Sequence, residues 1–212
     1  FGVTGMTAWF GLNEIGRPKP GDVLVVSSAG GATGSIAGQL ALAAGCRVVG
    51  ITSTEEKCQW LLDSLGFDAV INYTDDGWPQ KLQCACPDGI DIYFDNAGGA
   101  ILDTALGQIR DGARVVLCGG ISRYNLSTPP TGPGNYFNLI FRRAKMEGFI
   151  VLDHAKEFNS AISSMRPLLD SGQLKNKTTI TDGFEALPDA LISIFQGSNI
   201  GKQLVRISAP CA

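Results

Sequence analysis

The sequence predicts an α/β fold, a doubly wound parallel sheet of six strands with helices on both faces. Three observations support this prediction. Short β-branched runs alternate with longer helical patterns, a glycine-rich turn joins the first run to the helix that follows it, and 27 of the 212 residues are glycine. Alternation at this spacing produces right-handed βαβ crossovers, and such crossovers build a parallel sheet.

The expected elements follow one another along the first two thirds of the chain. A helix over residues 5–14 precedes six strand runs at residues 23–26, 47–51, 69–72, 90–94, 114–118 and 145–151. Helices are expected between these runs at residues 35–44, 55–65, 78–84, 100–109 and 136–143. Such sheets bind ligands at the carboxyl ends of their strands, so we expect the site there.

Composition excludes several classes of function. The formal net charge is −3 with no block of like charges, so the basic patch typical of nucleic-acid binders is absent. Residues 23–46 carry no charge, but their centre is too polar and glycine-rich for a membrane-spanning helix. We therefore expect neither a nucleic-acid partner nor a membrane partner.

The cysteine pattern indicates a reducing, cytoplasmic setting. The six cysteines form no CxxC pair, and we interpret them as buried free thiols. They are Cys46, Cys58, Cys84, Cys86, Cys118 and Cys211. With a single histidine, His154, no histidine-rich zinc site is available in this chain, and we expect no metal.

The glycine-rich turn is the strongest local motif. The run at residues 23–26 leads into Ser28, Gly31 and Gly34 in the spacing SxxGxxG, and a helix follows at once. Gly31 would let the backbone approach a pyrophosphate, and Gly34 would let helix and strand pack closely. The free N–H groups at the helix start would hold the phosphates. We interpret this as a dinucleotide site, the alternative being a tight turn without a ligand.

The end of the second strand run indicates which dinucleotide binds. NAD-binding proteins place an acid there, whereas this run ends at Ser53 without one. Ser53 and Glu56 fit a capping box, and Lys57 lies in the first helical turn, where the helix dipole disfavours a cation. A bound 2′-phosphate would explain Lys57, and Tyr73 could close the same pocket. The alternatives are a solvated lysine and a half-buried aromatic ring.

Several strings together resemble one family. They are GMTA at 5–8, the glycine turn, EK at 56–57, FDNAGG at 94–99, CGGISRYN at 118–125 and NIGK at 199–202. In order and across essentially the whole chain, they resemble the zinc-independent medium-chain dehydrogenase/reductases. The similar branch contains prostaglandin reductases, leukotriene B4 12-hydroxydehydrogenase and plant alkenal double-bond reductases. Two departures are Ser28, where alanine is usual, and Ala97, where valine is common.

The resemblance implies a role for each matching residue in binding NADP(H). The implied cofactor-binding residues are Gly31, Ala32 and Gly34 at the pyrophosphate, Lys57 and Tyr73 at the 2′-phosphate, and Asn96, Cys118, Ile121, Ser122, Tyr124 and Asn199 around the nicotinamide and its ribose. It implies further that Tyr124 points at the substrate carbonyl as the catalytic residue. From the sequence alone, Cys118 could equally be a core residue and Tyr124 a packing residue.

The implied activity is NADPH-dependent reduction of the activated C=C bond of an enone or alkenal. Zinc-dependent relatives take a metal ligand from a cysteine near the start of this region, and no cysteine precedes Cys46. Hydride would add to the β-carbon, and the Tyr124 hydroxyl would stabilise the charge on the carbonyl oxygen. The alternatives are an NADPH quinone reductase and a dinucleotide-binding module without turnover.

The resemblance also implies a domain division and an assembly. Residues 1–152 would form the Rossmann nucleotide-binding core with one preceding helix. Residues 153–212 would return to an N-terminal substrate domain that lies ahead of Phe1. The run from Lys145 to Val151 would be the edge strand of the sheet, and relatives pair this edge across a two-fold axis. We therefore expect a homodimer.

Overall fold

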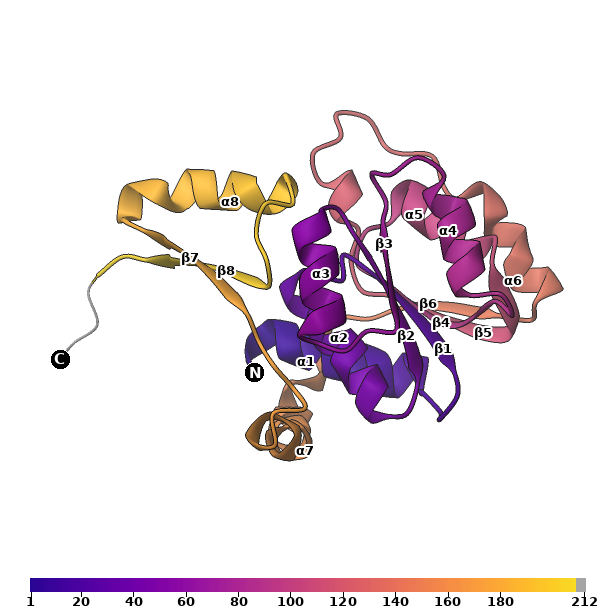
Figure 1. Cartoon of the computed structure of the whole chain (residues 1–212), viewed down its shortest axis with the longest axis horizontal. Helices are drawn as coiled ribbons and strands as arrows, with labels where there is room; N and C mark the ends of the chain where they lie inside the picture. The colour runs from indigo at the N-terminus through magenta and orange to yellow at the C-terminus, as the bar shows by residue number, and fades with distance from the viewer. Residues whose placement is uncertain (209–212) are drawn as a thin grey trace.

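The sheet has the predicted six parallel strands. The structure is a computed structural model that describes residues 1–208, and its strand order is β3-β2-β1-β4-β5-β6 (Figure 1). The strands are β1 Val23–Ser27, β2 Arg47–Thr52, β3 Ala69–Asn72, β4 Ile90–Asp95, β5 Ile109–Leu117 and β6 Lys145–Gly148. The order reverses between β1 and β4, and this switch point opens a crevice at the strand ends.

Helices cover both faces of the sheet, and each face has its own hydrophobic core. Side chains of a strand alternate between faces, so Leu24 and Val26 of β1 join one cluster while Val25 joins the other. The helices are α1 Gly2–Phe10, α2 Ala32–Ala43, α3 Glu55–Asp63, α4 Trp78–Ala85, α5 Gly99–Leu106, α6 Asn138–Phe141, α7 Phe158–Asp170 and α8 Leu187–Phe195. The doubly wound α/β prediction is therefore confirmed.

The last part of the chain forms a small unit beside the sheet. Strands β7 (Thr178–Asp182) and β8 (Lys202–Arg206) pair in parallel, and α8 connects them. Figure 1 shows this unit projecting from the six-stranded sheet, whereas α7 packs below α1. Met165 of α7 is fully buried in the first core cluster. The division of the chain near residue 152 stays a prediction.

Strand β6 is at the edge of the sheet, as predicted, but it is shorter than the run 145–151. Its neighbour β5 pairs with it from Arg114 to Leu117 and then ends. Beyond Gly148 the chain therefore has no strand to pair with, and it turns into a 3-10 helix at Val151–Glu157. The prediction was wrong here because a β-rich run does not reveal where its partner stops.

Other boundaries differ because glycines interrupt the helical patterns. The helix expected over 100–109 ends at Leu106, since Gly107 closes it and β5 begins at Ile109. The helix expected over 5–14 ends at Phe10 and continues as a π-helical segment, Gly11–Gly16. The helix expected over 136–143 begins instead as a 3-10 turn at Gly134–Phe137. Within residues 1–208, no helix combines the length and apolarity that crossing a bilayer requires.

Candidate functional site

Two neighbouring cavities lie at the carboxyl ends of the strands. The first, of about 320 Å³, contains eight of the eleven predicted cofactor residues: Gly31, Ala32, Gly34, Lys57, Tyr73, Asn96, Ile121 and Asn199. The other three, Cys118, Ser122 and Tyr124, line the second cavity, of about 1140 Å³. The structure thus brings most of the predicted site together and places the rest, which belong to the loop 118–124, in the neighbouring cavity.

The glycine turn has the geometry of an anion site. Gly31 is the N-cap residue of α2 and has no side chain, so no side chain caps the N–H groups of the first helical turn. These groups belong to residues that line the first cavity, and the helix dipole makes that end attractive to phosphate. A Cβ on Gly34 would lie 2.4 Å from the Ser28 carbonyl oxygen, so only glycine fits.

Lys57 is held beneath the glycine turn rather than solvated. It is only 6% exposed, and its ammonium group donates to the Gly197 carbonyl. Burial lowers the pKa of this lysine. Its stem crosses Gly30, where a Cβ would meet the lysine Cδ at 2.8 Å. The sequence reasoning missed Gly30, because the spacing SxxGxxG gives weight only to Gly31 and Gly34.

The predicted capping box at the start of α3 was wrong by one residue. Thr54, not Ser53, is the N-cap residue, and its hydroxyl accepts from the Lys57 N–H at 3.3 Å. Both residues are good N-caps, so the sequence does not distinguish them. Thr54 has the extended backbone of an N-cap, and Ser53 is left free to line the first cavity.

Two asparagines border the first cavity, each with its amide orientation held by the backbone. Nδ2 of Asn96, after β4, donates to the Ser27 carbonyl at 2.8 Å. Nδ2 of Asn199 donates to the Gly201 carbonyl at 2.8 Å. The tail reaches the site because the Gly201 N–H donates to the Gly30 carbonyl. Sequence reasoning missed Gly197, which this return of the tail brings to Lys57, and no local motif could have indicated it.

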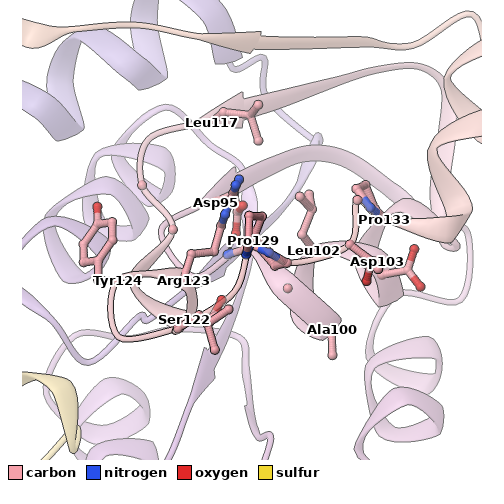
Figure 2. Close-up of a pocket in the computed structure, with 18 of the residues that line it drawn as sticks. Asp95, Ala100, Leu102, Asp103, Leu117, Ser122, Arg123, Tyr124, Pro129 and Pro133 are labelled. Carbon is pink, nitrogen blue, oxygen red and sulfur yellow. Dashed lines mark hydrogen bonds between the residues drawn. The ribbon is translucent and has the colours of Figure 1, made fainter.

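The second cavity lies between the strand ends, α5 and the proline-rich loop after β5 (Figure 2). Tyr124 is on this loop and is 65% exposed, with its hydroxyl 3.7 Å from where a Cβ on Gly119 would lie. Ser122 is anchored, since its hydroxyl donates to the Ala97 carbonyl at 2.7 Å. Within residues 1–208 the Tyr124 hydroxyl has no hydrogen-bond partner, so it could act as a donor.

The cysteines differ from the prediction that all six are buried. Cys84 is exposed and Cys118 is half-buried, while Cys211 lies outside the described residues. Burial raises the pKa of Cys118 to about 12 and those of Cys46 and Cys86 to about 11. Cys84 is exposed because it lies on the solvent side of α4.

We expect iodoacetamide at neutral pH to modify Cys84 long before Cys46, Cys86 or Cys118. The thiolate is the reactive form, and a raised pKa together with burial suppresses it. Peptide mass spectrometry after timed quenching measures the order. In Cys84→Ser the labelling of Cys46, Cys86 and Cys118 should stay slow, and fast labelling of Cys118 would contradict this assignment.

No group of three or more His, Cys, Asp or Glu side chains within residues 1–208 is arranged to hold a metal ion. The single histidine, His154, stacks on Phe10 with ring centroids 4.5 Å apart. It thus packs against the first core cluster.

Comparisons with known proteins agree with this geometry. The family model "Zinc-binding dehydrogenase" matches residues 32–166. The Bacillus subtilis (strain 168) protein YfmJ is 46% identical over 212 residues, which cover 99% of this chain and 62% of that protein. The 2-alkenal reductase (NADP(+)-dependent) of Nicotiana tabacum is 40% identical over 98% of this chain and 60% of the relative.

A solved structure agrees closely as well. CurA of Vibrio vulnificus in complex with NADPH has a TM-score of 0.94 and 41% identity, covering 99% of this chain and 64% of CurA. The chain thus spans a little over 60% of the length of the proteins it matches. With its sheet order, its glycine turn and the match over residues 32–166, the chain belongs to the zinc-binding dehydrogenase family of medium-chain dehydrogenase/reductases.

Proposed function

We propose that this chain is the NADPH-binding part of a reductase that reduces the activated C=C bond of an enone or alkenal. The observation that carries the proposal is the lining of the first cavity. Among the described residues it contains Lys57 and Lys202 and neither aspartate nor glutamate. A cavity with two cations, an uncapped helix start and no acid suits a dinucleotide with an additional phosphate.

The residues present fit each part of NADPH. The N–H groups at the start of α2 would bind the pyrophosphate, and Gly34 keeps the helix close enough to the strand. Lys57 would bind the 2′-phosphate through a charge-assisted contact, with Tyr73 beside it. Asn96 and Ile121 would lie at the nicotinamide end.

For this reaction the protein would need to orient the cofactor and the substrate and to supply one hydrogen-bond donor to the substrate carbonyl oxygen. When bound, NADPH supplies the hydride that adds to the β-carbon of the substrate. The Tyr124 hydroxyl would stabilise negative charge on the substrate carbonyl oxygen, and this hydroxyl or solvent would deliver the α-proton. The name of the tobacco relative, a 2-alkenal reductase, supports this class of small-molecule substrate.

We expect these 212 residues to bind NADPH yet to reduce enones negligibly. The relatives extend well beyond the matched region, and the family resemblance implies a substrate cleft between two domains. A substrate site with only one of its two walls neither positions the substrate nor excludes water. Fluorescence measures NADPH binding, and absorbance measures turnover, on one sample with alkenals, enones, quinones and alcohols.

The same panel tested on the full-length gene product decides the reaction class. Selective turnover of alkenals and enones supports the proposal, and preference for quinones would favour a quinone reductase. Absence of NADPH binding would refute the proposed function. Rapid turnover by the 212 residues alone would show that the site has been misplaced.

We further propose a homodimer through the β6 edge. The strand has one open side, and exposed apolar side chains precede and follow it in the chain, namely Ile140, Phe141, Ile150 and Leu152. An open apolar edge favours pairing with a second chain. The whole run from Lys145 to Val151 would take part, although only its first four residues form a strand here.

Light scattering and sedimentation should give the mass of a dimer for the wild type. Ile150→Lys should yield a monomer, because a charge at an edge opposes pairing. Leu169→Lys, which alters an exposed apolar residue of α7 far along the chain, should remain dimeric. A monomeric wild type at high concentration would contradict the assembly.

A cytoplasmic location is also proposed. The described cysteines are all free thiols, namely Cys46, Cys58, Cys84, Cys86 and Cys118. Free thiols of this number persist in reducing compartments. Fractionation of cells that express the tagged full-length protein would check the location.

A further inference from the structure

Asp95, at the carboxyl end of β4, has no role in the proposed chemistry. It is 1% exposed and is the only buried carboxylate among residues 1–208. No lysine, arginine or histidine forms an ion pair with it in that range. Burying a carboxylate costs free energy unless hydrogen bonds compensate for the lost water. Here the compensation comes from four hydrogen bonds that one carboxylate oxygen accepts.

Those donors come from two strands and one turn. Oδ1 of Asp95 accepts from the Tyr93 hydroxyl at 2.9 Å, the Ser27 hydroxyl at 3.1 Å, the Gly98 N–H at 3.0 Å and the Ala97 N–H at 3.2 Å. Hydrogen bonds to a charged acceptor are about twice as strong as neutral ones, and low dielectric strengthens them further. The carboxylate therefore fixes the turn 96–98 firmly.

The same group of bonds orients Asn96. The Ser27 hydroxyl donates to Asp95 and accepts from the Asn96 N–H at 2.8 Å. The Asn96 side chain then donates back to the Ser27 carbonyl at 2.8 Å. With its nitrogen bound in this way, the asparagine cannot turn its amide without losing a bond. Asp95 thus sets the position of a residue that borders the first cavity.

The loop 118–122 is attached to this turn, so its position also depends on Asp95. Five backbone or side-chain donors of the loop bind carbonyl oxygens of residues 95–97: the N–H groups of Cys118 and Gly119 to Asp95, that of Ile121 to Asn96, and the N–H and hydroxyl of Ser122 to Ala97. Residues of this loop line both cavities, Ile121 the first and Cys118, Gly119 and Ser122 the second. Figure 2 shows Asp95 above Ser122 of that loop and next to Arg123, which follows the loop.

We propose that Asp95 is a positioning residue for the nicotinamide end of the cofactor site. It acts through Asn96 and the loop 118–122. The 2′-phosphate position at Lys57, on the far side of β1, should be unaffected. This inference rests on the proposed function, because it presumes NADPH as the cofactor. It predicts that loss of the charge at Asp95 weakens binding of the nicotinamide end of NADPH and leaves binding of the 2′-phosphate end unchanged.

The test compares NADPH with 2′,5′-ADP, which carries the adenosine and 2′-phosphate and lacks the nicotinamide. In Asp95→Asn, which keeps the size of the side chain, NADPH affinity should fall roughly tenfold, because weaker bonds to the turn 96–98 let Asn96 and the loop 118–122 move. Affinity for 2′,5′-ADP should equal that of the wild type. The emission of bound NADPH should shift toward that of the free cofactor, since its ring is held less firmly.

Asp91→Asn is the matched control. Asp91 lies on the same strand at the opposite end of the sheet, where its Oδ2 accepts from the Val23 N–H at 2.8 Å and from Arg110 at 3.1 Å. This variant should bind both ligands as the wild type does. Ser27→Ala removes only the hydroxyl that links Asp95 to Asn96, and it should also weaken NADPH selectively.

The outcomes separate the inference from the proposed function. A wild type that fails to bind NADPH refutes the function itself. If the wild type binds NADPH and Asp95→Asn loses affinity for NADPH and for 2′,5′-ADP equally, Asp95 is needed only for folding. Unchanged NADPH affinity would also overturn the inference. If Asp95→Asn does not fold, the selectivity of Ser27→Ala decides in the same way.

Discussion

Lys57→Ala should abolish the preference for NADPH over NADH. In the wild type we expect NADPH to bind about 10- to 150-fold more tightly, because a charge-assisted hydrogen bond contributes roughly 1.5–3 kcal/mol. The buried ammonium group is already oriented by the Gly197 carbonyl, so little side-chain freedom is lost on binding. Titration of both cofactors into wild type and variant measures the ratio.

Two further variants separate the charge from the packing around Lys57. Gly30→Ala would push against the lysine stem, since the added Cβ lies 2.8 Å from Cδ, and it should reduce the preference while the fold persists. Lys81→Ala removes an exposed lysine that pairs with Asp75, and it should leave both affinities unchanged. Equal affinities for NADPH and NADH in the wild type would contradict the role of Lys57.

The preference should also depend on pH. Burial lowers the pKa of Lys57, so its ammonium form is lost at a lower pH than that of an ordinary lysine. The phosphate contact requires the charged form. The preference for NADPH should therefore be complete below this pKa and decline as the pH rises through it, while NADH affinity changes little. A preference that does not vary up to strongly alkaline pH would exclude Lys57 as the contact.

Tyr124→Phe in the full-length protein should lower kcat about 100-fold, the usual cost of losing one donor to a developing oxyanion. NADPH affinity should stay near that of the wild type, because the tyrosine lines the second cavity and not the first. The exposed hydroxyl has no partner that the substrate would need to displace within the described residues. Steady-state kinetics with an enone, under conditions where hydride transfer limits the rate, measures the effect.

The control for this change is Tyr136→Phe. Tyr136 is also exposed, lies beyond the same proline-rich loop and packs against Phe137, so the loss of its hydroxyl should not alter kcat. A Tyr124→Phe variant with unchanged kcat would return Tyr124 to a packing role. A parallel loss of NADPH affinity would place the hydroxyl at the cofactor rather than at the substrate.

The sequence by itself determined the layered sheet and which residues gather in much of the candidate site. Strand and helix periods are local properties, and the glycine turn at residues 28–34 is read within seven residues. The family strings added Asn96, Ile121 and Asn199, which the structure places in one cavity with Lys57. Their places could be predicted because backbone geometry near a strand end depends mainly on neighbours in the chain, whereas their roles in binding stay predictions.

Tertiary structure alone decided the contacts between distant segments. Lys57 meets Gly197 across 140 residues, and the Gly201 N–H reaches Gly30, because the tail returns beside the glycine turn. The place of the loop that leads to Tyr124 depends on bonds from residues 118–122 to the Asp95 turn. Strand β6 ends where β5 ends, so the length of β6 is set by its partner strand and not by its own sequence. Pairing, burial and loop anchoring each involve two segments, so neither segment's own sequence specifies them.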